Sequence, residues 1–418
     1  MFTTYRHGRQ RRARLQLPRE VLTRIIGSAD RNTLLICARV SRDFCADSQQ
    51  VIYREIHLQP HTTQAFALLV TFLGRPELGA YTHTLFIQEA EVHPAEVLGT
   101  QPRDEDDDLV AGLIAYMSRL RRLIIRRHIP RKFTPKLRTA VMGALPTLHT
   151  FGCYGAEYMP PHVFGRAPDL RDLWIYLDGY PGNLTSDGSA DAVTAYSAPV
   201  RLVSLVLIGM NQASGRKVLE AFLHPSSPID LSTLQGLQVQ TIYSLPGDVF
   251  RRLLGRCTDS LRHLDLMAGI IDRPLNLASL RSLESVTIRL IPLSSPMSDP
   301  CITHTADMLA TTVAVKHVYI TFMPFGNLNR DYKSIRTLGA LLGRPIVTAG
   351  KTPLETLTLW VCTEERKPAA WMRRTETKIK ENLRLYEDLT GTATWVRWVE
   401  EPLASFSGMD ILDPWTPI

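Results

Sequence analysis

The sequence has 418 residues, of which 44% are hydrophobic and 21% are charged, a balance that is typical of globular proteins and excludes wholesale disorder. Five of the seven net positive charges come from residues 1–16, which hold five arginines and no acid. The rest of the chain is therefore nearly neutral, which disfavours a dedicated nucleic-acid-binding protein.

Residues 1–16 predict a disordered basic arm. A nuclear-localisation signal and a non-specific polyanion contact are the alternatives to a plain solvated tail. The six cysteines have no CxxC spacing, and no apolar run approaches the roughly eighteen residues that cross a bilayer. We therefore expect a reduced protein of the cytoplasm or nucleus, without a disulfide framework, a zinc site or a membrane partner.

Residues 17–58 predict three short amphipathic helices. Pro18 suits the first helical position, and Glu20 lies in the first turn, where its negative charge interacts favourably with the helix dipole. Asp30 can cap the second helix and Ser41 the third, which we expect to run to residue 56. The apolar residues of the first helix form one stripe: Val21, Leu22, Ile25 and Ile26.

A unit of this size carries more apolar side chains than it can bury by itself. Each side chain that something else covers contributes about 1.5–3 kcal/mol. Either the rest of the chain or a separate protein can cover this surplus. Composition alone favours the first of these interpretations.

The order of motifs in this segment resembles an F-box of a type abundant in mushroom-forming fungi. "LPREVLTRII", "LLICARVSRDF" and "IYREIHL" correspond to the three parts of that pattern, with Ile52–Tyr53 where the family often has Leu-Tyr or a tryptophan. The resemblance covers Leu17 to Leu58, about a tenth of the chain. It implies docking to the Skp-type adaptor of a Skp–cullin–F-box ubiquitin ligase through Leu17, Pro18, Glu20, Val21, Leu22, Ile25, Leu34, Leu35, Val40, Ser41, Phe44 and Tyr53.

After a helical linker at residues 59–79, one short pattern recurs from residue 80 to residue 363: an apolar residue, two spacers, an apolar residue, one spacer and an apolar residue. Helical stretches lie between the matches, which are 22 to 39 residues apart. A repeated strand and helix predict a curved α/β solenoid with a parallel sheet. The middle apolar residues of the matches are Leu85, Leu123, Leu148, Leu173, Leu205, Leu237, Leu264, Val286, Val318 and Leu357.

This region resembles the irregular leucine-rich-repeat half of many F-box proteins, although the asparagine usual in such repeats is mostly absent. The predicted fold class is thus α/β, a three-helix F-box followed by a leucine-rich-repeat-like solenoid. Residues 364–418 break the pattern and read as a mixed-charge helix, a short strand and an irregular end. We expect this segment to cap the last repeat.

Residues that alternate with the buried ones are expected on the concave face of the sheet. One predicted row runs from Phe86 to Thr358 and includes His149, and the next runs from Gln88 to Trp360 and includes Phe151. Aromatic and charged residues in these rows are the expected substrate contacts, unless other segments of the chain cover them: Arg126, Trp174, Tyr176, Asp265, Met267, Arg289, Tyr319 and Trp360.

Other motifs have simpler explanations than chemistry. The acidic run "RDEDDDL" can bind a divalent cation, but an acidic helix start is favoured. The basic stretch from Arg119 to Arg138 can bind phosphate or an acidic degron, and pairing with the preceding acids is slightly favoured. "SLRHLDL" places Ser260, His263 and Asp265 together, although the leucine spacing explains it better than a catalytic triad.

The sequence gives no reason to assign an enzymatic activity, a metal or a cofactor. The expected function is therefore that of a ligase adaptor which presents a protein substrate. The alternatives are a scaffold or regulator that acts without a cullin and, more distantly, a nucleic-acid-associated factor that uses the basic arm and the Arg119–Arg138 stretch.

Overall fold

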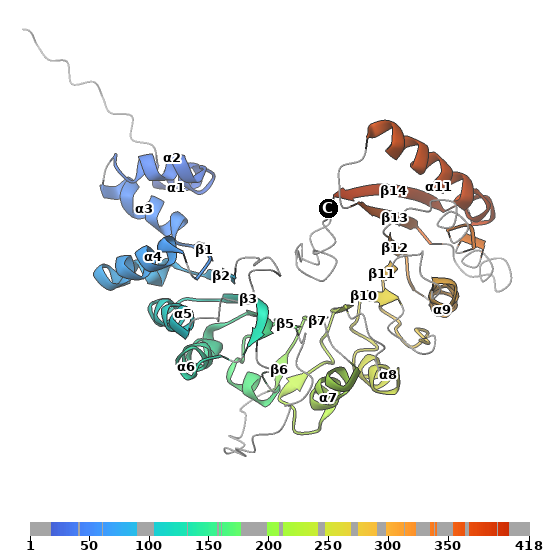
Figure 1. The fold of residues 1–418 in the computed structure, drawn as a ribbon, viewed down its shortest axis with the longest axis horizontal. Helices are drawn as coiled ribbons and strands as arrows, with labels where there is room; N and C mark the ends of the chain where they lie inside the picture. Colours follow the sequence, from blue (N-terminus) through green and yellow to red (C-terminus); the bar gives the residue numbers. More distant parts are fainter. Residues whose placement is uncertain are drawn as a thin grey trace, which may run out of the picture.

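The computed structural model describes residues 18–40, 42–60, 62–89, 104–131, 133–156, 159, 161–176, 199–208, 212–240, 247–268, 275–290, 298–312, 314–322, 335–337, 339–340, 354–363, 368–390 and 392–400. In this part of the chain, twelve parallel strands form one sheet in the order β1-β2-β3-β4-β5-β7-β9-β10-β11-β12-β13-β14. The sheet curves, with helices along its outer face (Figure 1). The predicted basic arm lies outside the described residues.

The strands of the large sheet are β1 Glu55–Leu58, β2 Thr84–Gln88, β3 Arg122–Arg131, β4 Thr150–Ala156, β5 Asp172–Tyr176, β7 Ser204–Ile208, β9 Gly236–Gln240, β10 His263–Ala268, β11 Ser285–Leu290, β12 His317–Phe322, β13 Thr356–Thr363 and β14 Ala393–Glu400. Two short strands, β6 Val200–Arg201 and β8 Ile229–Asp230, pair separately.

The helices are α1 Arg19–Gly27, α2 Arg31–Cys37, α3 Arg42–Ile52, α4 Thr63–Gly74, α5 Asp104–Tyr116, α6 Pro135–Ala144, α7 Gln212–Leu223, α8 Gly247–Arg256, α9 Ser298–Ala310 and α11 Ala369–Thr390, with 3₁₀ turns at η1 Pro76–Tyr81, η2 Leu145–Thr147 and η3 Pro161–Arg166. Helices α1 to α3 form one end of the molecule, and α11 with β14 forms the other (Figure 1). None of the helices in the described ranges combines the length and the apolar character that a membrane crossing requires.

A continuous apolar ladder runs through the sheet and forms its core against the helices. Nine of the ten predicted middle residues lie in this ladder, each aligned with a ladder residue of the adjacent strand. The predicted strand positions are therefore confirmed at these nine residues. Leu148 is the exception, because Phe151 occupies its rung between Leu123 and Leu173. Ile56 and Thr394 extend the ladder at its two ends.

The prediction at Leu148 was wrong by three residues. Leu145 begins the 3₁₀ turn η2, Leu148 packs just before β4, and Phe151 is 1% exposed inside the strand. The fitting frame is Leu148, Phe151 and Cys153, which has the same spacing as the other matches. Phe151 therefore belongs to the core and not to the predicted concave row. Gly152 takes the place predicted for His149 in the row of Trp174, and Tyr154 takes the place predicted for Phe151 beside Arg126.

Two predicted boundaries also shift. The third helix ends at Ile52, and Glu55–Leu58 forms β1 in register with β2, so the sheet begins inside the F-box-like segment. The apolar pair at Ile56 and Leu58 alternates with exposed residues, which fits a strand instead of a helix. At the first helix, Pro18 precedes α1 and its carbonyl accepts hydrogen bonds from the amides of Val21 and Leu22.

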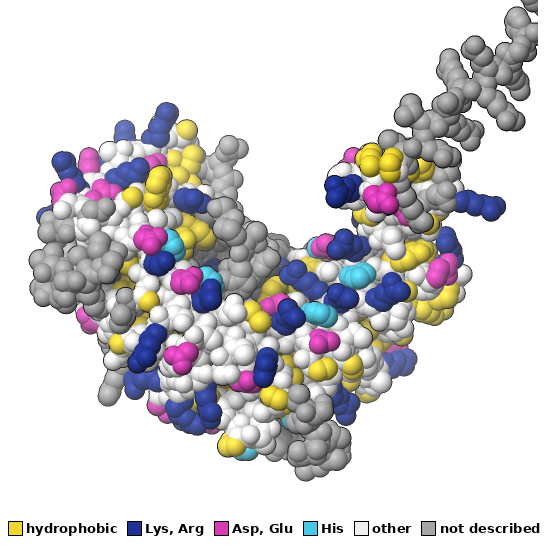
Figure 2. All heavy atoms as spheres, turned by 180° about the vertical axis from the view of Figure 1, so that it is seen from behind, with side chains coloured by type: hydrophobic (Ala, Val, Ile, Leu, Met, Phe, Trp, Pro, Cys, Tyr) yellow, Lys and Arg dark blue, Asp and Glu magenta, His cyan; other side chains and the backbone are white. Residues whose placement is uncertain are grey.

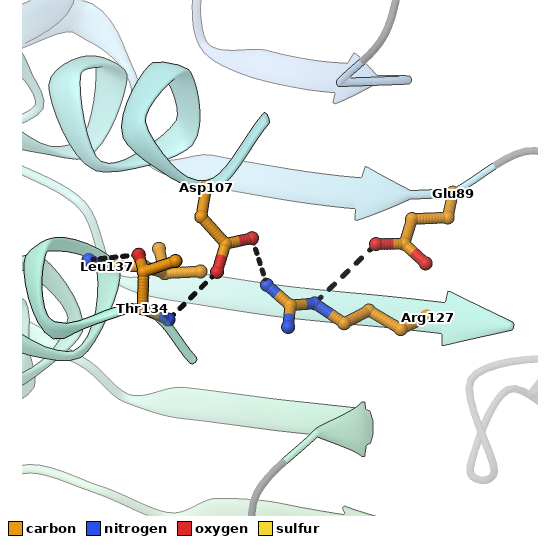
Figure 3. A network of polar contacts seen from close by, with 5 residues as sticks. All are labelled: Glu89, Asp107, Arg127, Thr134 and Leu137. Atoms are coloured by element: carbon orange, nitrogen blue, oxygen red, sulfur yellow. Dashed lines mark hydrogen bonds and ion pairs between the residues drawn. The ribbon is translucent and has the colours of Figure 1, made fainter. Parts of the chain in front are cut away.

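The acidic run at residues 104–108 begins α5 and connects three elements (Figure 3). Asp107 is buried and forms an ion pair with Arg127 of β3, and its second oxygen accepts a hydrogen bond from the Thr134 amide at 3.0 Å, just before α6. Glu89 lies 3.7 Å from the Arg127 Nε on the other side. The favoured interpretation, an acidic helix start that pairs with the following cations, agrees with these contacts and with the Asp108–Lys136 pair at 2.5 Å.

Candidate protein-docking surfaces

The three N-terminal helices are held together by local signals. Asp30 caps α2 as predicted, because its carboxylate accepts hydrogen bonds from the amides of Asn32 and Thr33 at 2.9 and 3.0 Å. The Thr33 hydroxyl also donates to the Asp30 carboxylate at 2.7 Å, and this hydrogen bond first, then those of the backbone amides, lowers the pKa of the Asp30 carboxyl. α1 ends at Gly27 with Ser28 as its C-cap.

Apolar side chains of this helical end remain exposed. We name as the helical-end patch Val21 at 41%, Ile25 at 53%, Leu35 at 48%, Ile36 at 65% and Val40 at 67% relative exposure. The fully buried apolar side chains of α1 and α2 are Ile26 and Leu34. The described part of the chain therefore leaves the surplus predicted from the sequence uncovered.

The remaining predicted docking residues take different positions. Pro18 and Glu20 are exposed, Leu22 and Phe44 are half-buried, and Leu34 is buried in the helical unit. Tyr53 is half-buried, and its ring lies 5.9 Å from that of Phe72 in α4, which joins the helical unit to the sheet. Leu17 and Ser41 lie outside the described residues.

Helix α4 carries an exposed apolar stripe that was not expected from the sequence. Phe66, Val70 and Leu73 are spaced at i, i+4 and i+7, and all three are exposed, whereas Ala65 and Phe72 face the core. The sequence signal was available in "TTQAFALLVTFLG", whose apolar residues are too many for one buried face. The prediction of a helical linker at residues 59–79 did not include an exposed apolar face.

The concave face of the sheet has a small apolar cluster of its own, formed by Ile124, Trp174, Val206 and Ile208 with Phe86 at its border. Trp174 is 5% exposed, and its ring packs over Gly152, where a Cβ atom would lie 3.2 Å from Trp174 Cε3 and 3.3 Å from Ile124 Cγ1. The guanidinium carbon of Arg122 lies 5.3 Å from the Trp174 ring centroid. The absence of a side chain at Gly152 thus allows the Trp174 ring to pack against the sheet and to cover this part of the concave face.

Other predicted substrate contacts are engaged within the chain. Arg289 donates three hydrogen bonds to Asp265, two of them from Nε, with the closest approach at 2.9 Å, so the two charges largely offset each other. Tyr319 and Trp360 lie side by side with ring centroids 5.8 Å apart and are half-buried. Arg126 and Met267 are buried, and the side chain of Tyr176 lies outside the described part of the structure.

No protein-family model matches this chain, and no curated protein matches it.

The residues of "SLRHLDL" do not form a catalytic triad. Ser260 donates to the Leu234 carbonyl at 2.8 Å, His263 Nδ1 lies 2.7 Å from Ser285 Oγ, and Asp265 pairs with Arg289. Burial lowers the pKa of His263, with smaller contributions from neighbouring charges. Burial also raises the pKa of the Cys257 thiol to about 12, so this thiol stays protonated at neutral pH.

Proposed function

We propose that this chain is the substrate-recognition adaptor of a Skp–cullin–F-box ubiquitin ligase. The observation that carries the proposal is the helical-end patch, whose five apolar side chains come from the F-box-like segment and stay exposed. The ligase chemistry would reside in the partner proteins, and this chain would supply binding alone.

The magnitude of the exposed area supports a docking role. Covering five aliphatic side chains that are about half exposed contributes on the order of 5 kcal/mol. Scattered single apolar residues are normal on a protein surface, but here five stay exposed between residues 21 and 40, on α1, α2 and the turn that follows, which favours a protein-interaction site.

The second half of the proposal concerns the curved sheet, which we interpret as a leucine-rich-repeat solenoid that holds the substrate. Its strands repeat one apolar spacing and stack in register, and its helices lie on the outer face. Such solenoids offer long inner surfaces and edges to protein partners.

The test is co-purification of the full chain with a Skp-type adaptor from the same source. We expect Ile25→Glu combined with Val40→Glu to reduce adaptor binding at least tenfold, because two charges would be buried without partners. Both side chains are exposed, so folding should be unaffected, which a thermal melt checks. Val70→Glu on α4 is the matched control outside the F-box-like segment, and it should leave adaptor binding unchanged.

Adaptor binding that is absent from the unmodified chain, or that survives the double substitution, would overturn the proposal. A scaffold that acts without a cullin would then be favoured. Ubiquitin transfer to bound proteins in a reconstituted ligase, lost with the same double substitution, would extend the support from docking to function.

A further inference from the structure

Each strand of the sheet is preceded by one residue that lies on the edge of the solenoid. In the N-terminal half, these positions hold cationic or titratable side chains in five successive rungs, which we name the basic rim: Arg54, His83, Arg121, His149 and Arg171. The three arginines are exposed and the two histidines are half-exposed. Figure 2 shows Lys, Arg and His side chains gathered on this arm of the curved molecule.

The spacing along the basic rim is set by the backbone. The His83 amide donates to the Arg54 carbonyl at 2.9 Å, and the Arg121 amide donates to the His83 carbonyl at 2.9 Å. In the same way, the His149 amide donates to the Arg121 carbonyl at 2.7 Å, and the Arg171 amide donates to the His149 carbonyl at 2.8 Å. Because adjacent strands are about 4.8 Å apart, the five side chains form a line roughly 19 Å long.

The C-terminal half of the same edge provides an internal comparison. There each cation has an acidic neighbour: Arg262 lies 3.7 Å from Glu284, and Lys316 lies 3.8 Å from Glu355. In the described part of the chain, no ion pair involves Arg54, Arg121 or Arg171. The edge is therefore balanced in charge at one end and positive at the other.

The positive charge of the basic rim acts on His83, one of its two histidines. The pKa of His83 is lowered by partial burial first, and then by the positive charges of Arg121, Arg54 and Arg119. Arg122 extends the positive surface onto the concave face, where its guanidinium lies over the Trp174 ring, and its buried Nε has no hydrogen-bond acceptor among the described residues. Glu55, which contacts His57, and Asp172, which accepts a hydrogen bond from Thr150, are the acids at the first positions of these strands.

The form of the basic rim favours one kind of anion. Single charges in a straight line complement a line of single negative charges, whereas a phosphate group is held by donors that converge on one point. Single-stranded nucleic acid needs exposed aromatic rings on which bases stack, and the neighbouring Trp174 is buried. An extended segment rich in Asp and Glu fits both the linear charge and the length.

We propose that the basic rim binds an acidic, Asp- and Glu-rich segment of a partner protein. If the chain is a ligase adaptor, the acidic segment is the part of the substrate that it recognises. This identification of the partner as a substrate rests on the proposed function. The binding itself does not involve the F-box-like helices.

The test is fluorescence anisotropy of the full chain with a labelled octaglutamate peptide at low salt. Replacement of Arg121 and Arg171 by Glu should weaken binding at least tenfold, and replacement of both by Gln should weaken it by a smaller factor. The matched control is Arg251→Glu with Arg252→Glu, two exposed arginines of α8. It changes the net charge equally and should leave binding within about twofold. Added salt should weaken binding to the unmodified chain.

Equal losses in the rim variant and the α8 control would overturn the proposal, because net charge alone would then explain the binding. Tighter binding of a labelled single-stranded RNA or of a peptide with one phosphoserine would also overturn it. Adaptor co-purification with the rim variant distinguishes the two proposals, since it should be unchanged if the helical end docks independently.

Discussion

His263 lies at the start of β10 with its ring Nδ1 2.7 Å from Ser285 Oγ, and burial lowers its pKa below the ordinary value of 6.5. The unfolded chain therefore binds a proton near pH 6.5 that the folded chain does not bind. The free energy of unfolding is therefore undiminished by this histidine above pH 6.5. It decreases as the pH falls from 6.5 toward the lower pKa of His263 in the folded state. His83 acts in the same direction.

We accordingly expect the free energy of unfolding to fall between pH 7.5 and pH 5.5, and the fall to be smaller in His263→Gln. Urea denaturation at the two pH values measures both quantities. An unchanged slope in His263→Gln would show that other groups dominate.

Gly152 is a position where a single added methyl group would disturb the packing of the concave face. In Gly152→Ala the new methyl group would press on Trp174 and Ile124, so we expect a destabilisation of about 1–3 kcal/mol. At Gly143 in α6 a Cβ atom would meet nothing within 4 Å, and Gly143→Ala should stabilise the protein by roughly 0.5–1 kcal/mol. Chemical denaturation compares the two, and opposite signs are the expected result.

At the scale of elements, the buried Asp107–Arg127 pair fastens α5 and β3 to the start of α6. Asp107→Ala leaves a buried guanidinium without this carboxylate, and we expect a loss of about 3–5 kcal/mol. Asp108→Ala breaks the exposed pair with Lys136 and should cost roughly 0–1 kcal/mol. Similar urea midpoints for the two variants would contradict this interpretation of the network.

The element positions themselves were largely predictable. Apolar spacing located most strands because their inner side chains are buried in every rung, as for Leu173 and Leu205. It failed at Leu148, where Leu145, Leu148 and Phe151 allow two frames and only the neighbouring strands select one. It also failed at Ile56, because a short apolar alternation fits a helix end as well as a strand.

At the scale of the whole molecule, each inner strand of the described large sheet pairs with one strand before it and one after it along the chain, with β6 and β8 paired separately. We expect Tyr386→Ala, which removes a fully buried ring of α11, to raise hydrogen exchange near β13 and β14 and to leave β1 to β3 protected. Hydrogen-exchange mass spectrometry checks this. Loss of protection throughout the sheet would show that the solenoid unfolds as one cooperative unit.

Local pattern alone determined that the chain combines short N-terminal helices with a parallel α/β sheet, because burial imposes periods that are visible in the residues themselves. The same pattern identified Val21, Ile25 and Leu35 as apolar. Only the tertiary structure decided that these side chains stay exposed while Ile26 and Leu34 are buried, since burial depends on what packs from elsewhere in the chain.

The basic rim and the closed part of the concave face were likewise invisible in the sequence. Arg54, Arg121 and Arg171 are separated by long stretches of chain, and strand register places them on one edge. Register also sets Trp174 beside Gly152 and so buries a side chain that its type marked as a contact residue. Periodicity is a property of neighbours along the chain, whereas a surface is made by neighbours across the sheet.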